Sequence, residues 1–371
     1  MTIALDATYS LDRNLSGVGV YSRQLSFGLA EAHLDTSFLF CYRSHRLFRS
    51  FRDRLPRNAA RAWLRSDGFW PYPARLFHAL NQRVDSVRAK HIVSTFHDLF
   101  VLTGDYSTQE FRVRFAGQAR RAAERSELLI AVSEFTADQL VNVLSVDRSR
   151  IRVIHHGVAD PPPGLPPSEE DREDIVLHVG AIQHRKNILR LVEAFEATAP
   201  GWRLVLAGSD GYGAAEIRDH IAKSPRAADI ELCGYVTDAQ LEELYAKARV
   251  FAFPSLAEGF GMPVLDAMAR GIPVLTSNRS ATKEVAGNAA LLIDPTDVDS
   301  ITSGLTRVTQ SPTLRNQLRK AGLSRATEFS WSKAVARTWQ VYEELTGPAS
   351  AAPRRLQSLG LSGTSDPGSS T

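Results

Sequence analysis

The chain has 371 residues, more than one ordinary hydrophobic core supports, so we expect two domains. Hydrophobic residues make up 43% and charged residues 23%, as in soluble globular proteins, and no apolar run of about 18 residues predicts a membrane span. The net charge of +3 arises in the front half, and the two distant cysteines, Cys41 and Cys233, argue against a disulfide framework and favour a reducing, cytoplasmic setting.

The chain opens with a predicted strand and helix. Residues 2–7 are typical of a strand, and a helical pattern continues to about Ala32. Between them lie Gly17 and Gly19, which allow the backbone to approach a ligand closely. A strand, a Gly-x-Gly turn and a helix are typical of the entry to a Rossmann-like domain, although such turns also occur for packing alone.

Residues 42–65 hold eight arginines with interleaved apolar and aromatic side chains. This pattern predicts a basic amphipathic surface that suits an anionic membrane or a lipid-linked, phosphorylated acceptor. A solvated helix face rich in arginine is an equally weighted alternative. Nucleic acid is not an expected partner, because no recognised nucleic-acid motif accompanies the arginines. The residues singled out for this surface are Arg46, Phe48, Arg49, Phe51 and Arg52.

A polar pair, His97 and Asp98, follows the predicted strand 91–96. Ligands of open α/β sheets bind at the carboxyl ends of strands, so this pair is well placed for a site. Farther along, Ser133 is positioned to cap a predicted helix, Glu134–Leu144.

The pattern of strands and helices restarts after a proline-rich segment. Residues 161–174 are predicted to form a semi-rigid linker. The strand Ile175–Val179 then leads to Gly180 and to two adjacent cations, Arg185 and Lys186. Cations at a strand-to-helix turn suit an anion at the helix N-terminus, although a solvated loop pair is the alternative.

The most informative stretch is residues 254–271, which follows a predicted buried strand. Gly259 and Gly261 allow a tight turn into a short helix, whose N-terminus suits a phosphate group. Two carboxylates, Glu258 and Asp266, flank the turn and can accept hydrogen bonds from sugar hydroxyls. A phosphate cradle with hydroxyl acceptors suggests a sugar nucleotide.

This stretch and Gly180–Asn187 resemble the motifs of retaining glycosyltransferases of family 4, and the resemblance extends from residue 1 to about residue 347. It implies an α/β chain with the GT-B fold, in which two doubly wound Rossmann-like domains face each other across a cleft. The implied parts are an acceptor-side domain (1–160), a nucleotide-sugar-binding domain (175–330) and a helix that packs back on the first domain (331–347). The composition of residues 348–371 predicts a disordered tail.

The resemblance also implies roles for single residues. His97 and Glu258 would act at the reacting sugar, Arg185 and Lys186 would bind the diphosphate, and Asp266 would hold the ribose hydroxyls. The backbone at Tyr235 and Val236 would lie against the base. The full donor-binding set is Gly17, Gly19, Gly180, Arg185, Lys186, Tyr235, Val236, Glu258, Gly259, Phe260, Gly261 and Asp266. Neither a cofactor nor a metal is expected, because the cations and a helix N-terminus can stabilise the departing diphosphate.

The implied function is transfer of a sugar, with mannose from GDP-mannose as the expected donor, to a saccharide or lipid-linked acceptor in bacterial-type polysaccharide or glycoconjugate synthesis. The expected location is the cytoplasm, at or near the inner face of the plasma membrane. Glucosyl or rhamnosyl transfer from a UDP- or dTDP-sugar is the near alternative. A non-catalytic nucleotide-sugar or polyanion-binding protein is another, and a nicotinamide-dependent dehydrogenase is weakened by the missing Gly-x-Gly-x-x-Gly motif.

Overall fold

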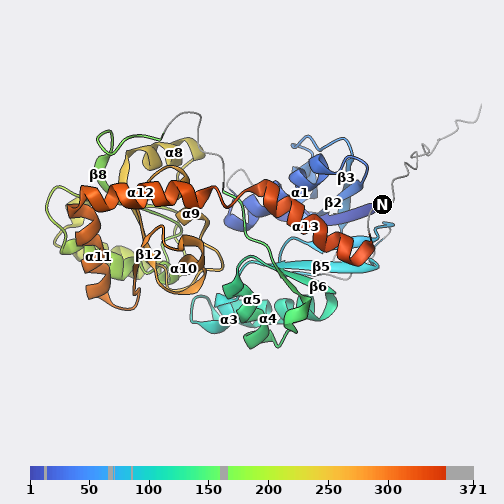
Figure 1. The fold of residues 1–371 in the computed structure, drawn as a ribbon. Coiled ribbons are helices and arrows are strands. Elements are labelled where there is room, and N and C mark those ends of the chain that lie inside the picture. The colour runs from blue at the N-terminus through green and yellow to red at the C-terminus, as the bar shows by residue number, and fades with distance from the viewer. Residues whose placement is uncertain (12–14, 66–69, 71, 85–86, 159–165, 348–371) are drawn as a thin grey trace, which may run out of the picture.

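The computed structural model describes residues 1–11, 15–65, 70, 72–84, 87–158 and 166–347. The predicted linker lies outside these residues up to position 165, and the predicted disordered tail, residues 348–371, lies wholly outside them. The strands form two separate parallel sheets, one in each half of the molecule (Figure 1). We call the part built on β1–β7 the first half and the part built on β8–β13 the second half.

The sheet of the first half has the strand order β3-β2-β1-β4-β5-β6-β7, so the order reverses between β1 and β4. Its strands are β1 (Thr2–Asp6), β2 (Ser37–Arg43), β3 (Ala59–Leu64), β4 (Leu76–Ala79), β5 (His91–Phe96), β6 (Leu128–Ala131) and β7 (Ile151–Val153). The helices of this half are α1 (Gly17–Ala32), α2 (Ser44–Ser50), α3 (Phe100–Thr103), α4 (Gln109–Arg125) and α5 (Glu134–Leu144), together with the last helix of the chain, α13 (Trp331–Thr346).

The sheet of the second half has the order β10-β9-β8-β11-β12-β13 and reverses between β8 and β11. Its strands are β8 (Glu173–Val179), β9 (Arg203–Ala207), β10 (Ile230–Gly234), β11 (Ala248–Phe253), β12 (Val274–Ser277) and β13 (Leu291–Ile293). Its helices are α6 (Ile188–Glu196), α7 (Ala214–Lys223), α8 (Asp238–Lys247), α9 (Met262–Ala269), α10 (Ser280–Ala286), α11 (Val298–Gln310) and α12 (Pro312–Ala326). The two sheets confirm the predicted α/β class, and both points of reversal are places where ligands of such sheets bind.

Both sheets are covered by helices on both faces, which explains why their strands are apolar on both sides. In β11, for example, Val250 and Ala252 point into one core, whereas Phe251 and Phe253 point into the other, and all four are fully buried. The loops that follow the carboxyl ends of β5, β8 and β11 carry the polar residues predicted for the site.

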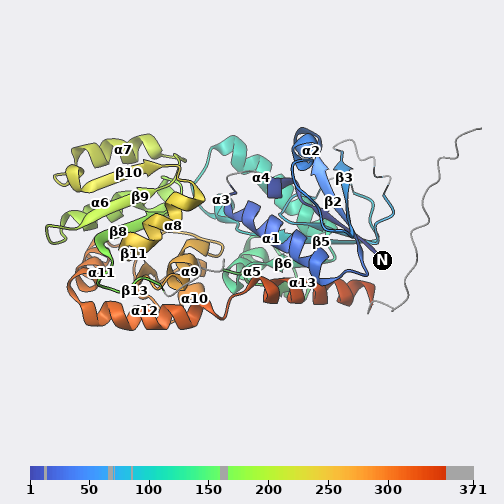
Figure 2. The ribbon, with the colours of Figure 1, turned by 90° about the horizontal axis from the view of Figure 1, so that it is seen from above.

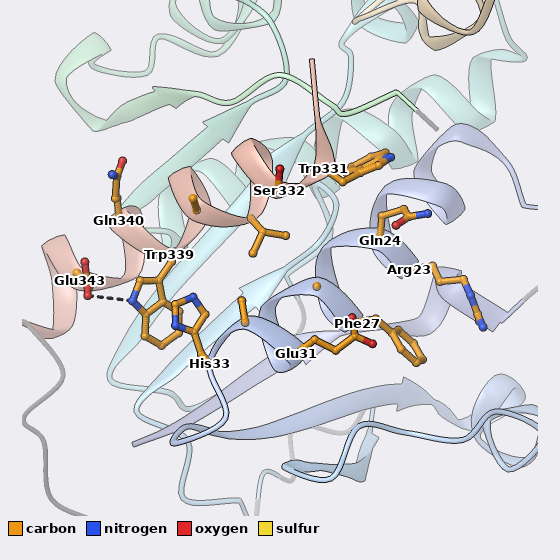
Figure 3. A pocket seen from close by; sticks show the side chains of 14 residues that line it. Arg23, Gln24, Phe27, Glu31, His33, Trp331, Ser332, Trp339, Gln340 and Glu343 are labelled. Atoms are coloured by element: carbon orange, nitrogen blue, oxygen red, sulfur yellow. Dashed lines mark hydrogen bonds between the residues drawn. The ribbon is translucent and has the colours of Figure 1, made fainter. Parts of the chain in front are cut away.

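Helix α13 connects the halves. It follows α12 of the second half and packs against α1 of the first half, as Figures 1 and 2 show. The Tyr342 hydroxyl lies 2.6 Å from Nδ1 of His78, and the Trp339 ring stacks on His33 with the ring centroids 3.5 Å apart. Beside this contact, α1 and α13 border a groove of about 900 Å³ (Figure 3). The last described helix of the chain therefore packs on the half that contains the first strand.

Two local expectations need correction. Gly17 and Gly19 belong to the first turn of α1, because the Ser16 side chain accepts a hydrogen bond from the Gly19 N–H and starts the helix there. The arginine-rich residues 42–65 are divided among β2, α2, β3 and the residues between and after them, so the alternative of one solvated helix face does not describe them. One of these arginines, Arg43, is buried and pairs with Asp6 at 2.9 Å, so part of the arginine content is structural.

Candidate active site

The loop after β11 passes directly against the first half. A Cβ atom placed on Gly259 would lie 1.6 Å from the carbonyl oxygen of His97 and 2.9 Å from Cβ of Asp98. Only glycine fits at such a distance. The tight approach brings Glu258, the neighbour of Gly259, to the boundary between the halves.

Glu258 forms two ion pairs with the cations that follow β8. Its Oε1 lies 2.7 Å from Nζ of Lys186, and its Oε2 lies 2.8 Å from Nη1 of Arg185. Both cations belong to one 3₁₀ turn, His184–Lys186, and all three residues are at most 8% exposed. Since β8 and β11 are neighbours at the reversal of strand order, the fold brings together residues about 70 positions apart.

The charges of this trio depend on one another. Burial alone would raise the pKa of Glu258, but the adjacent Arg185 and Lys186 outweigh this effect and lower the pKa to about 2. Burial lowers the pKa of Lys186, and the ion pair with Glu258 opposes that shift. The carboxylate is thus ionised at neutral pH and forms ion pairs with the two cations to which an external anion would bind.

Arg185 also contacts the first half. Its guanidinium carbon lies 4.0 Å from the centroid of the Phe100 ring, a cation–π distance. Sequence reasoning missed Phe100, because an isolated phenylalanine after a polar pair carries no signal of a contact with a distant arginine.

His97 is buried and neutral. Its Nε2 lies 2.9 Å from the carbonyl oxygen of Leu80, and because a carbonyl can only accept, Nε2 must carry the proton. Burial lowers the pKa of His97 to about 4, against the opposing effect of this hydrogen bond. At neutral pH the other ring nitrogen, Nδ1, is therefore an acceptor.

Asp98 lies among the same charges. Burial raises the pKa of its carboxyl to about 7; Arg185 opposes the shift and Glu258 adds to it. The group is therefore partly protonated near neutral pH and can act as either a donor or an acceptor of a hydrogen bond.

Two helix N-termini meet near this cluster. A Cβ atom on Gly17, the first residue of α1, would lie 2.8 Å from Cε of Met262, the first residue of α9. Gly261, with φ of 101°, makes the left-handed turn that starts α9. The positive ends of both helix dipoles therefore lie close together, which favours an anion.

Gly180 leaves room for Lys186, since a Cβ atom there would lie 3.2 Å from the lysine Cε. Tyr235, Val236 and Asp266 are the remaining predicted residues. Tyr235 and Val236 follow β10, and Tyr235 is 49% exposed. Asp266, on α9, lies 3.9 Å from Nη1 of Arg270, and burial raises the pKa of its carboxyl to about 6.

Phe260, predicted as a donor-binding residue, also packs against the first half. Its ring packs on His156 of the first half with centroids 4.8 Å apart, so it contributes to the contact between the halves. Ser133 was predicted only as a helix cap, yet its hydroxyl also bonds to the Gly259 carbonyl oxygen at 2.6 Å.

One acidic pair, Asp297 and Asp299, has the Asp-x-Asp spacing that can suggest a metal site. Here the Asp297 side chain accepts a hydrogen bond of 3.0 Å from the Asp299 N–H and caps α11. Among the residues that the structure describes, no group of three or more His, Cys, Asp or Glu side chains is arranged to hold a metal ion.

Comparison with known proteins places both halves in described families. Residues 15–160 match "Glycosyltransferase Family 4", and residues 166–325 match "Glycosyl transferases group 1". O-antigen chain mannosyltransferase B of Escherichia coli is 30% identical over 320 residues, which cover 82% of each chain. The MMP alpha-(1->4)-mannosyltransferase of Mycolicibacterium hassiacum is 42% identical over 113 residues, 29% of this chain and 28% of that one. Sucrose-phosphate synthase from Thermosynechococcus elongatus has a similar fold, with a TM-score of 0.73 and 21% identity over 93% of this chain and 99% of the other.

Proposed function

This chain belongs to glycosyltransferase family 4 and has the GT-B fold, and on that premise we propose that it transfers mannose from GDP-mannose with retention of configuration. The acceptor is a hydroxyl group of a saccharide or of a lipid-linked saccharide, in the synthesis of a polysaccharide or related glycoconjugate. The choice of mannose is supported by the names of the Escherichia coli and Mycolicibacterium hassiacum relatives.

The observation that carries the proposal is the position of Glu258 between Arg185 and Lys186, where the two halves meet. The diphosphate of the donor would replace Glu258 as the counter-ion of these cations. Glu258 would then be free to accept hydrogen bonds from the hydroxyls of the donor sugar. The N-termini of α1 and α9 add positive potential at the same place.

The chemical step requires stabilisation of a departing diphosphate and of positive charge that develops on the sugar. Arg185 and Lys186 serve the first need, so no metal ion is required in the proposed reaction. Neutral His97, with Nδ1 as an acceptor, would orient the sugar and stabilise the developing charge. Retention of configuration is proposed from the family resemblance.

Calorimetric titration without added metal tests the donor. We expect GDP to bind in preference to UDP, dTDP, ADP and NADH, and Lys186→Ala to weaken GDP binding by at least about tenfold. Lys223→Ala is a matched control, since Lys223 lies on the same half and pairs with Asp219 at its surface. Preference for UDP or dTDP would replace mannose by another sugar, and binding of NADH alone would contradict glycosyl transfer.

The stereochemistry and the metal requirement need a second experiment. Proton NMR of the product formed from GDP-α-mannose should show an α-linked mannose, with the same rate in the presence of EDTA. A β-linked product would contradict retention, and a rate lost in EDTA and restored by Mg²⁺ would contradict the metal-free step.

We also propose that α2 and the residues after it contact an anionic membrane surface from the cytoplasmic side. Phe48 is 85% exposed and Phe51 is 66% exposed, and arginines 46, 49 and 52 alternate with them. Among the helices that the structure describes, none has the length and apolar character needed to cross a membrane.

Co-sedimentation with vesicles of phosphatidylcholine and phosphatidylglycerol tests this contact. Binding at low salt is expected, and Phe48→Ser with Phe51→Ser should reduce it. Phe111→Ser is the control, because Phe111 is a partly exposed aromatic residue on α4. Equal binding of all three proteins would contradict the proposed surface.

A further inference from the structure

The N-terminus of α5 joins the two halves. Ser133 donates from Oγ to the carbonyl oxygen of Gly259 at 2.6 Å, and Thr136 donates from Oγ1 to the same oxygen at 3.1 Å. Ser133 also accepts the N–H of Thr136 at 3.0 Å, as a helix cap does. Both hydroxyls are fully buried, so one pair of side chains starts the helix and holds the backbone of the other half.

The same helix end is held by a carboxylate from the second half. Glu284 of α10 accepts the N–H of Glu134 at 3.0 Å on Oε1 and the N–H of Phe135 at 3.2 Å on Oε2. Its Oε1 also lies 2.7 Å from Nε2 of His155, which follows β7 in the first half. These N–H groups belong to the first turn of α5, where no partner within the helix exists.

The charge of Glu284 suits this position. Burial would raise the pKa of its carboxyl, but hydrogen bonds from His155, Glu134 and Phe135 outweigh burial and lower it. The carboxylate is thus ionised at neutral pH and lies at the positive end of the α5 dipole.

We propose that Ser133, Thr136, Glu284 and His155 form an interdomain clasp that positions Glu258 against His97. The carbonyl held by Ser133 and Thr136 belongs to Gly259, the covalent neighbour of Glu258. Contacts between domains of one chain commonly permit relative movement, so a specific set of bonds is needed to fix the two halves of a site in register. The clasp residues are positioning residues, since they act through Gly259 and α5.

The inference rests on the proposed glycosyl transfer only where turnover is measured. The central variant is Glu284→Ala, and the conservative one is Glu284→Gln, which keeps an acceptor for one N–H. Glu127→Ala is the matched control, because Glu127 also pairs with a histidine, His91 at 3.1 Å, but both residues belong to the first half.

Hydrogen exchange, GDP titration and turnover of GDP-mannose are then compared. In Glu284→Ala the amides of residues 134 and 135 should exchange at least about tenfold faster, and turnover should fall by about tenfold. Affinity for GDP should stay within about twofold, because the nucleotide is proposed to bind mainly to the second half. Glu284→Gln should recover part of the turnover, and Glu127→Ala should match the wild type.

Unchanged exchange at residues 134 and 135 in Glu284→Ala would overturn the clasp, as would unchanged turnover. A loss of GDP affinity equal to the loss of turnover would overturn it too, since Glu284 would then act on the nucleotide site. If Glu284→Ala does not fold, Thr136→Val tests the other side of the clasp with the same readouts. A wild-type protein that binds GDP but transfers no sugar contradicts the proposed function, whereas the exchange measurement still decides the clasp.

Discussion

Single residues at the site are held by opposite charges rather than by hydrophobic packing. Glu258 pairs directly with two buried cations, so its removal leaves both without their ion-pair partner, which is the costly way to break a buried ion pair. In the proposed reaction, the diphosphate of the donor would offer the charge that Glu258 supplies in its absence.

Glu258→Ala should lower the free energy of unfolding by about 3 kcal/mol. GDP should restore part of this loss, because its diphosphate takes the place of the carboxylate between Arg185 and Lys186. Affinity for GDP should therefore equal or exceed that of the wild type, whereas turnover should fall. Urea unfolding with and without GDP measures both effects, and weaker GDP binding by the variant would contradict the exchange of counter-ions.

Asp98 should make stability depend on pH. Its carboxyl has a pKa of about 7 in the folded protein against an ordinary value of 3.8, so between these values the folded state binds more protons than the unfolded state. The contribution of Asp98 to stability is thus fully present below about pH 4 and is lost as the pH rises through 7.

Asp98→Asn removes this dependence. Relative to the wild type, the variant should gain at least about 1 kcal/mol of unfolding free energy between pH 5 and pH 8. Urea unfolding at the two pH values gives the difference, and Asp105→Asn, an exposed aspartate nearby in sequence, is the control. A constant difference between Asp98→Asn and wild type would show that Asp98 is ionised throughout.

At the level of elements, most of the alternation of strands and helices was predictable, because periodicity and caps are local signals. Helix α5 has the predicted bounds, Glu134–Leu144, since Ser133 caps it as the sequence indicates. The arginine-rich segment was not predictable in this way. Arg61 donates to the carbonyl oxygens of Ser50 and Asp53, partners that only the folded chain brings near.

The same limit applies to the site. The sequence motifs indicated that Arg185, Lys186 and Glu258 all face a ligand, and the structure brings the three together. The ion pairs among the three side chains could not be predicted. A motif indicates which residues face a ligand, but it does not indicate how these residues pair with one another when no ligand is bound. Phe100 contributes to the site through the packing of α3, which no local pattern reveals.

The packing of α13 on the first half leads to a prediction at the level of elements. Tyr342→Phe would leave Nδ1 of His78 buried without its partner, which should cost about 1–3 kcal/mol of unfolding free energy. Thermal and urea unfolding measure the loss. Tyr212→Phe, at a partly exposed position of the second half, should be neutral, and an equally neutral Tyr342→Phe would show that His78 needs no such bond.

For the whole molecule, the decisive feature is how closely the halves approach each other. Gly259 lies against the backbone of His97, and Arg185 lies over the ring of Phe100. The predicted site residues of both halves thus meet only when the halves are in contact, so the proposed activity should report on their arrangement as well as on side-chain chemistry.

Gly259→Ala should separate these contributions. The added Cβ would lie 1.6 Å from the His97 carbonyl oxygen, so the halves should fold but not reach the observed contact. Turnover should fall at least about tenfold while GDP affinity stays within about twofold, and small-angle scattering should show a larger radius of gyration. Gly117→Ala on α4, where a Cβ meets only the end of Arg121 at 3.6 Å, is the control. An active, compact Gly259→Ala protein would contradict the need for this approach.

The path of α13 has a consequence for biosynthesis. One face of the first sheet is covered by α1 together with Val335, Trp339 and Tyr342 of α13, which the ribosome adds only after all of the second half. Domains generally fold in the order of their synthesis, but here the earlier one lacks part of its core until translation is nearly complete. During translation the first half therefore exposes an apolar surface until α13 has been synthesised. A fragment that ends at residue 158 should aggregate rather than fold alone.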